Sequence, residues 1–145
     1  MPRHPGIHHV TAIARNPRRN LDFYTRALGL RLVKKTVNFD DPGAYHFYYG
    51  DETGRPGTIL TFFPWPDIRA GQGGTGFAHE TLFRVPEGSL GYWAGRLVAE
   101  GIVHEAPETR FGRRLLPFRD PDGLRLGLVG DPQAGAEPGW SAGAV

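Results

Sequence analysis

Two adjacent histidines, His8 and His9, stand in the apolar run GIHHVT from Gly6 to Thr11. Imidazole nitrogens bind divalent metals and transfer protons near neutral pH, so either residue could serve a catalytic centre. Neighbouring side chains of a strand point to opposite faces, so at most one of the two can face a given side of a sheet. The residues beside them decide whether they are ligands or ordinary strand residues.

A third histidine, His46, lies in AYHFYYGD among aromatic residues that could wall a flat substrate. His46 and His8 are the candidates for moving a proton during catalysis. The candidate residues of a substrate pocket around them are Tyr48, Thr61, Phe63 and Trp65. Each also has a structural interpretation, since histidines and aromatic residues on strands commonly belong to a packed core.

The elements that position these residues follow one order twice, strand, helix and three strands. In the first copy we expect strands at 7–14, 31–38, 45–49 and 58–63, with a helix that starts at Asn16-Pro17 and ends at Gly29. In the second copy we expect strands at 78–85 and near Ile102, Leu115 and Leu124, with a helix at 89–100.

Direct matches support the repeat, because NLDFYTRAL at 20–28 aligns with SLGYWAGRL at 89–97, and GTILTFF at 57–63 aligns with GLRLGLV at 123–129. The alternative is an unrelated α+β sandwich with coincidental helices. We predict an α+β fold of two tandem βαβββ units, at about 6–66 and 75–131. Their curled mixed sheets would form a cup with the helices outside.

This order, together with HHVTAIARNPRRNLDFYTRALGLRLVKKTVNFDDPGAYHFYYGDETGRPGTILTFFPW, resembles the vicinal oxygen chelate superfamily. That superfamily includes glyoxalase I, bleomycin-resistance proteins and extradiol dioxygenases. More narrowly, VKKTVNFDDPGAYHFYYGD and the following GTILTFFPW resemble the amino-terminal half of two-domain ring-cleaving dioxygenases that act on hydroquinones. The broad resemblance covers nearly the whole chain, and the narrow one is densest from His8 to Trp65.

In one-domain members, the resemblance implies, metal ligands occupy equivalent positions on the first and last strands of each unit. The repeat places His9 and Glu80 at the first-strand positions, and Thr61 and Gly127 at the last-strand positions. Histidine and glutamate suit Fe(II) or Mn(II), whereas a threonine hydroxyl is a poor ligand and glycine offers none. One chain thus carries an incomplete ligand set, unless a bulge brings His79 into the site.

The resemblance also implies where the missing ligands are found. In the two-domain enzymes, a first-strand histidine of the amino-terminal half, matched here by His9, joins a histidine and a glutamate of the carboxy-terminal half. Residues 132–145 are rich in proline and glycine and are typical of a linker. We therefore expect one domain at 1–131 with a linker-like tail, completed by a separately encoded carboxy-terminal half or by a second copy in a homodimer.

Two functions remain open. The first, implied by the resemblance, is metal-dependent cleavage of an aromatic diol, with only a partial site in each chain. The second is a non-catalytic dimer that binds a small molecule without metal, like the drug-sequestering members of the superfamily. Thr61 and Gly127 favour the second function, and they also weaken a glyoxalase-type isomerase, whose chemistry relies on metal-bound carboxylates.

The composition argues against several other classes. The chain has 145 residues and no cysteine, which excludes disulfides and thiolate metal sites. Its first residues lack the apolar segment of a signal peptide, and no stretch approaches the ~20 apolar residues that cross a bilayer. The net charge is only +2 and the basic residues are scattered, unlike a nucleic-acid surface. We therefore expect a cytoplasmic protein that binds neither membranes nor nucleic acids.

Overall fold

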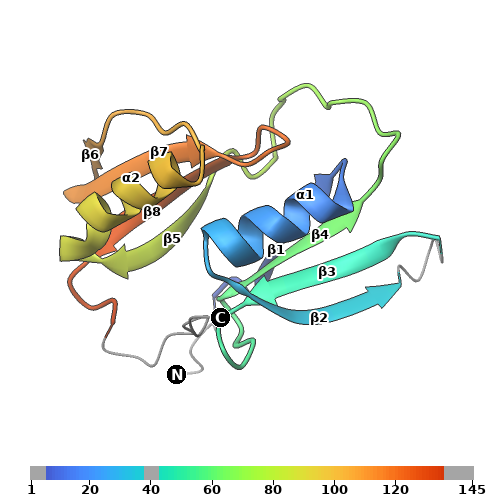
Figure 1. Ribbon diagram of the computed structural model, residues 1–145, viewed down its shortest axis with the longest axis horizontal. Helices are drawn as coiled ribbons and strands as arrows, with labels where there is room; N and C mark the ends of the chain where they lie inside the picture. The colour runs from blue at the N-terminus through green and yellow to red at the C-terminus, as the bar shows by residue number, and fades with distance from the viewer. Residues whose placement is uncertain (1–5, 38–42, 136–145) are drawn as a thin grey trace. The chain divides into compact units, whose positions relative to one another are not determined.

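The computed structural model describes residues 6–37 and 43–135. The chain divides into two compact units, which join between Arg69 and Ala70. Each unit has one four-stranded mixed sheet with a helical segment across one face (Figure 1). We call them unit 1 and unit 2 and describe each by itself.

Unit 1 contains the first half of the expected repeat. Its strands are β1 (His9–Ala14), β2 (Arg31–Val37), β3 (Tyr45–Gly50) and β4 (Ile59–Pro64). They are ordered β1-β4-β3-β2, with β1 parallel to β4 and the other neighbours antiparallel. Parallel pairing of β1 with β4 requires a crossover, which the intervening helix and two strands supply.

The helix of unit 1 begins as its sequence predicts. Asn16 has extended backbone angles and accepts a hydrogen bond from the Arg19 N–H at 2.9 Å, and Pro17 occupies the first turn of α1 (Pro17–Asp22). The helix then widens into a π-helical segment, η1 (Phe23–Ala27). The Thr25 hydroxyl donates to the Leu21 carbonyl at 2.7 Å, the group that a regular helical N–H would use.

The core of unit 1 lies between this helix and one face of the sheet. Tyr24 of η1 stacks on Tyr49 of β3 at 5.1 Å between ring centroids, and its ring lies 4.7 Å from that of Phe62 in β4. All three side chains are fully buried. Because side chains alternate along a strand, the residues next to Tyr49 in β3 and next to Phe62 in β4 point to the opposite face of the sheet.

Unit 2 repeats the same topology. Its strands are β5 (Thr81–Pro86), β6 (Glu108–Arg110), β7 (Arg113–Arg119) and β8 (Arg125–Asp131), ordered β5-β8-β7-β6. A short 3-10 turn, η2 (Glu87–Ser89), leads into α2 (Leu90–Ala99). The largest buried apolar side chains of this unit are Leu97, Leu115, Leu116, Phe118 and Leu126.

The predicted α+β fold of two βαβββ units is confirmed, with one element displaced. The strand expected near Ile102 does not form; only His104 makes an isolated bridge there, with Phe118. Pairing with β7 starts at Glu108 instead. Pro107 directly precedes that residue, and proline has no N–H to donate to a ladder.

The strand registers agree with the internal alignment. Thr11 lies opposite Thr61 in the parallel pair of unit 1, and Leu82 lies opposite Gly127 in that of unit 2. The two parallel strand pairs therefore have the same register when Thr61 is aligned with Gly127, which is the alignment that the internal repeat gives. Counting back two residues from Thr11 and from Leu82 makes His9 and Glu80 equivalent.

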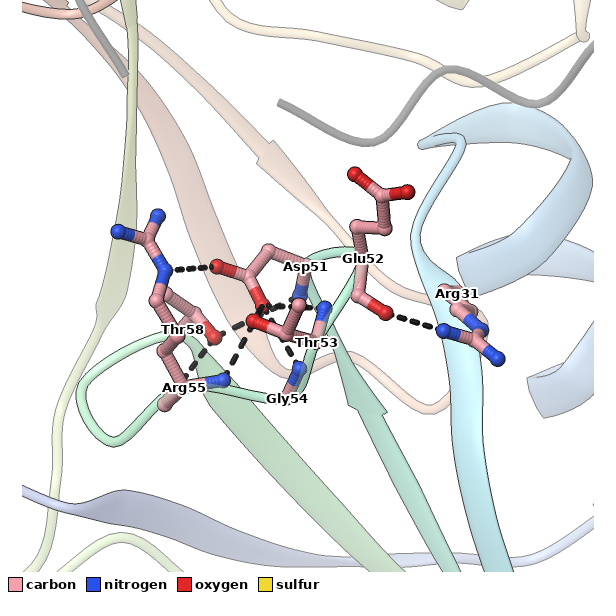
Figure 2. A network of polar contacts seen from close by, with 7 residues as sticks. All are labelled: Arg31, Asp51, Glu52, Thr53, Gly54, Arg55 and Thr58. Carbon is pink, nitrogen blue, oxygen red and sulfur yellow. Dashed lines mark hydrogen bonds and ion pairs between the residues drawn. The ribbon is translucent and has the colours of Figure 1, made fainter. Parts of the chain in front are cut away.

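The loop between β3 and β4 is held by a single carboxylate (Figure 2). Asp51 Oδ1 accepts hydrogen bonds from the N–H groups of Thr53, Gly54 and Arg55 at 3.2, 2.8 and 3.1 Å. Its Oδ2 pairs with Arg55 Nε at 2.6 Å. Thr58 also donates to the Arg55 carbonyl at 2.7 Å, so the loop enters β4 in a fixed conformation.

Two expectations concern parts of the chain that the structure covers incompletely. The linker-like tail at 132–145 lies outside the described residues beyond position 135. The last residue of the strand expected at 31–38 is also outside them. Within 6–37 and 43–135, no helix combines the length and the hydropathy that a membrane span requires.

Candidate functional site

The sheet face of unit 1 opposite α1 and η1 gathers the candidate residues of that unit, and we call it the histidine face. Three cross-strand pairs define it: Thr11 with Thr61, Tyr48 with Thr61, and His46 with Thr36. By strand alternation, His9 of β1 and Phe63 of β4 also belong to it.

His46 lies at the centre of an aromatic stack on this face. Its ring centroid is 3.9 Å from that of Phe63, with an interplanar angle of 27°. The Phe63 ring in turn stacks on Trp65, with centroids 5.8 Å apart at 20°. All three side chains are half-buried. The stack presents flat, partly exposed surfaces, which are suited to contact with another flat ring.

Tyr48 fixes the orientation of the His46 ring. The Tyr48 hydroxyl and His46 Nδ1 form a hydrogen bond of 2.9 Å, and the two ring centroids are 4.1 Å apart. His46 Nε2 is buried and has no hydrogen-bond partner among the described residues. Burial lowers the pKa of His46, and the charges of His9 and Lys34 lower it further. A neutral imidazole with one unused nitrogen can exchange a proton with a bound hydroxyl.

Thr61 does not line an open surface. Its side chain is fully buried, and its hydroxyl forms a 2.9 Å hydrogen bond with that of Thr11 on the neighbouring strand. The two hydroxyls satisfy each other and hold β1 against β4. Thr61 is therefore buried, and Thr11 is the exposed member of this hydroxyl pair.

His8 and His9 meet directly, which strand alternation did not predict. Their Nδ1 atoms are 3.1 Å apart in a hydrogen bond, and the rings pack edge to face with centroids 5.2 Å apart. His8 precedes β1, so the alternation rule does not govern its direction. Because both Nδ1 atoms are engaged, the nitrogen that His9 has available for another partner is Nε2.

In unit 2, Glu80 is tied to two arginines. Its side chain is only 8% exposed and forms an ion pair with Arg110, which also pairs with Glu108. Its other oxygen lies 4.0 Å from Arg125 Nε. Arginine is a persistent cation whose planar group matches carboxylate geometry, so these contacts occupy the Glu80 side chain within unit 2.

In unit 2 the position equivalent to Thr61 is Gly127, and no space is left there for a side chain. A Cβ at Gly127 would lie 2.7 Å from Leu115 Cδ1 and 2.8 Å from Leu82 Cδ2, so these two leucines occupy the space that a side chain would need. His79 precedes β5, whose register with β8 runs unbroken from Thr81 to Pro86, so the bulge that would bring His79 into the site stays a prediction. His79 is exposed.

The candidate ligands do not by themselves make a metal centre. Within 6–37 and 43–135, no three histidine, cysteine or acidic side chains come together as a metal site would require. His9 belongs to unit 1 and Glu80 to unit 2. The Glu80 carboxylate is also occupied by arginine. The described residues therefore do not supply a complete ligand set for Fe(II) or Mn(II), and the metal stays a prediction.

Lys34 and Thr11 are two residues of this face that sequence reasoning missed, and Thr36 is a third. Lys34 lies opposite Tyr48 on β2, and its Nζ is 5.5 Å from the Tyr48 ring centroid. The register shifts between Leu32 and Lys34, so counting alternate residues along β2 does not predict the direction of Lys34. Thr11 was detectable, since it stands two residues after His9 on the same strand face.

Comparison with known proteins identifies the family of the chain. The model of the Glyoxalase/Bleomycin resistance protein/Dioxygenase superfamily matches residues 6–128. The chain belongs to this superfamily. The fold and the family resemblance predicted from the sequence are thereby confirmed.

Similar proteins include ring-cleaving dioxygenases. The "Putative ring-cleaving dioxygenase MhqE" of Bacillus subtilis is 53% identical over 130 residues, which are 90% of this chain and 43% of that protein. The chlorohydroquinone/hydroquinone 1,2-dioxygenase of Sphingobium indicum is 32% identical, over 94% of this chain and 44% of its own length. The chain thus spans less than half the length of these relatives.

A solved structure gives the same picture. The crystal structure of a "putative dioxygenase" from Bacillus subtilis superposes with a TM-score of 0.83 at 50% identity, over 87% of this chain and 40% of that one. The similarity therefore concerns one part of a larger protein.

Proposed function

We propose that the chain is a domain of a ring-cleaving dioxygenase-type protein, and that the histidine face of unit 1 binds a hydroxylated aromatic ring. The observation that carries the proposal is the stack of His46, Phe63 and Trp65 on the same sheet face as His9. The names of the two relatives support it, since both refer to ring cleavage or to hydroquinone.

Each residue has a role in this proposal. A flat ring packs against the stack at Phe63 and Trp65, where aromatic contacts favour offset geometry. Tyr48 holds the His46 ring through its hydroxyl. His46 then exchanges a proton with a ring hydroxyl through Nε2, which is buried in the free chain and has to become accessible when the ring binds, since general acid–base chemistry requires a group within hydrogen-bond reach. His8 orients the His9 ring through the contact between their Nδ1 atoms.

A metal is not assigned to this chain alone. His9 is the one candidate ligand on the ring-binding face, and Glu80 remains a candidate only if its arginine pairs are broken. We propose that any Fe(II) or Mn(II) site is completed by a carboxy-terminal half or by a second copy of the chain. No step of the chemistry above depends on it.

The alternative function is a binding module without metal. It is favoured by the closure of Gly127 beneath Leu82 and Leu115, and by the ion pairs of Glu80, since both remove ligand positions from unit 2. Under this alternative the same aromatic face binds the ring, and no reaction follows.

Titration calorimetry with hydroquinone under anaerobic conditions tests the proposal. We expect binding that Phe63→Ala weakens by about 1 kcal/mol, or roughly fivefold, because one aromatic contact is lost. Phe77→Ala, at an exposed aromatic residue of unit 2, is the matched control and should leave the affinity unchanged. Absence of binding to the folded chain would refute both functions.

Repeating the titration with Fe(II) separates the two functions. Tighter binding of hydroquinone in the presence of Fe(II), abolished in His9→Ala, supports the dioxygenase-type domain. Binding that is indifferent to both Fe(II) and His9→Ala excludes a metal site formed by copies of this chain alone, and leaves the metal-free module as its function in the absence of a carboxy-terminal half.

A further inference from the structure

Two adjacent lysines of β2 lie on opposite faces of the sheet in unit 1. Lys34 is paired with Tyr48 on the histidine face, and Lys35 is paired with Phe47 on the face that packs against the helix. Each ammonium group lies over a tyrosine ring: Lys34 Nζ is 5.5 Å from the centroid of Tyr48, and Lys35 Nζ is 4.0 Å from that of Tyr45. Both lysines are exposed.

Among the residues that the structure describes, the strands of the histidine face carry basic side chains and no acidic one. The ionisable strand residues of this face within the described ranges are His9, Lys34, His46 and Tyr48, and none of them is acidic. No described carboxylate forms an ion pair with Lys34. The Lys34 charge also lies close enough to His46 to help lower the pKa of that imidazole. Tyr48, which contacts His46 of the aromatic stack, thus lies beside a cation that nothing in the described chain neutralises.

We propose that this face selects a hydroxylated aromatic ring that bears a negative charge, and that Lys34 is the residue that selects it. The inference deepens the proposed function and rests on it. A neutral ring gains only stacking on Phe63 and Trp65, whereas an anionic ring also gains attraction to Lys34. The charge on the ring is a carboxylate substituent or an ionised hydroxyl, since either presents an oxygen anion to an ammonium group.

Calorimetric titration of the full chain at low ionic strength, without added metal, tests the inference with three probes. Hydroquinone is the neutral ring, 2,5-dihydroxybenzoate adds a carboxylate, and nitrohydroquinone has a more acidic hydroxyl. We expect one or both anionic probes to bind about fivefold more tightly than hydroquinone, the upper range for an exposed ion pair. The preference should weaken as salt is added, because exposed charges are screened.

Variants at the two lysines assign the effect to one residue. Lys34→Gln should remove the preference for the anionic probes while retaining hydroquinone binding. Lys35→Gln, a substitution of the same kind on the other face, should retain the preference. The inference is overturned if the wild-type chain binds all three probes equally, or if Lys34→Gln leaves the preference intact. If no probe binds, the proposed function fails as well, so the two failures are distinguishable.

Discussion

The Tyr49 hydroxyl links the sheet of unit 1 to its helix through a single buried hydrogen bond. It donates to Asn20 Oδ1 at 2.9 Å, and both side chains are almost fully buried. Burial raises the pKa of Tyr49 well above its usual value, so the hydroxyl stays protonated and remains a donor. Tyr49→Phe should lower the free energy of unfolding by about 1–2 kcal/mol, because the Asn20 oxygen is left unsatisfied in the core. Urea denaturation measures this loss.

Tyr45→Phe provides the control for this prediction, since Tyr45 lies on the same strand and is 47% exposed. Its hydroxyl can be replaced by water, so the change in unfolding free energy should be close to zero. Equal losses in the two variants would contradict the role given to the Tyr49 hydrogen bond.

Much of the histidine face could be predicted from single residues, because alternation along a strand requires no knowledge of distant contacts. His9, His46, Tyr48 and Phe63 were proposed as site residues and share one face. The pairing of His8 with His9 could not be predicted, since it depends on where β1 begins. Their roles as ligand, proton carrier and pocket residues stay predictions.

At the scale of elements, the loop from β3 to β4 depends on the charge of Asp51. Burial raises the pKa of Asp51, but hydrogen bonds from the Arg55 side chain and from the N–H groups of Arg55, Gly54 and Thr53 outweigh it, so the pKa lies below 3.8. The ionised carboxylate therefore stabilises the folded state at pH values above 3.8, and this contribution is lost as the pH falls through the folded-state pKa.

Asp51→Asn should destabilise unit 1 by about 1–2 kcal/mol near neutral pH, because charge-assisted hydrogen bonds are replaced by weaker ones. The difference from the wild-type chain should shrink as the pH is lowered below 3.8, the ordinary value for this carboxyl. Chemical denaturation at several pH values measures it. Asp22→Asn, in an exposed pair with Arg26, should have a smaller effect, and a difference at Asp51 that is constant with pH would contradict the argument.

Helix boundaries were more predictable than the strands that follow them. The Asn16 cap with Pro17, and the glycines Gly29 and Gly101 with φ of 69° and 71°, mark helix ends that local chemistry determines. The π-helical widening of η1 and the late start of β6 depend on side-chain hydrogen bonds and on pairing with β7. A hydrophobic pattern carries no information on either.

For the molecule as a whole, the repeat predicts two units with the same topology. It does not predict that equivalent positions in the two units make different contacts. Unit 1 has a hydroxyl pair between Thr11 and Thr61, where unit 2 has Leu82 beside Gly127. His9 is exposed, whereas its equivalent Glu80 is largely buried in ion pairs. The common hollow expected for these two residues stays a prediction. The binding face proposed above belongs to unit 1, whereas in unit 2 the equivalent positions are occupied by leucines and by ion pairs.

Two glycines of unit 2 should respond in opposite directions when they are replaced by alanine, as measured by the free energy of unfolding. Gly127→Ala should lower the unfolding free energy by about 1 kcal/mol: Leu82 is 42% exposed and can move aside, but Leu115 is packed in the core and would be compressed. Gly91→Ala, in α2 with nothing within 4 Å of the new Cβ, should raise it by about 0.5–1 kcal/mol, since alanine favours a helix. Thermal and urea denaturation measure both changes. Hydroquinone affinity should remain that of the wild-type chain in each variant, and a large loss in folded Gly127→Ala would show that unit 2 takes part in binding.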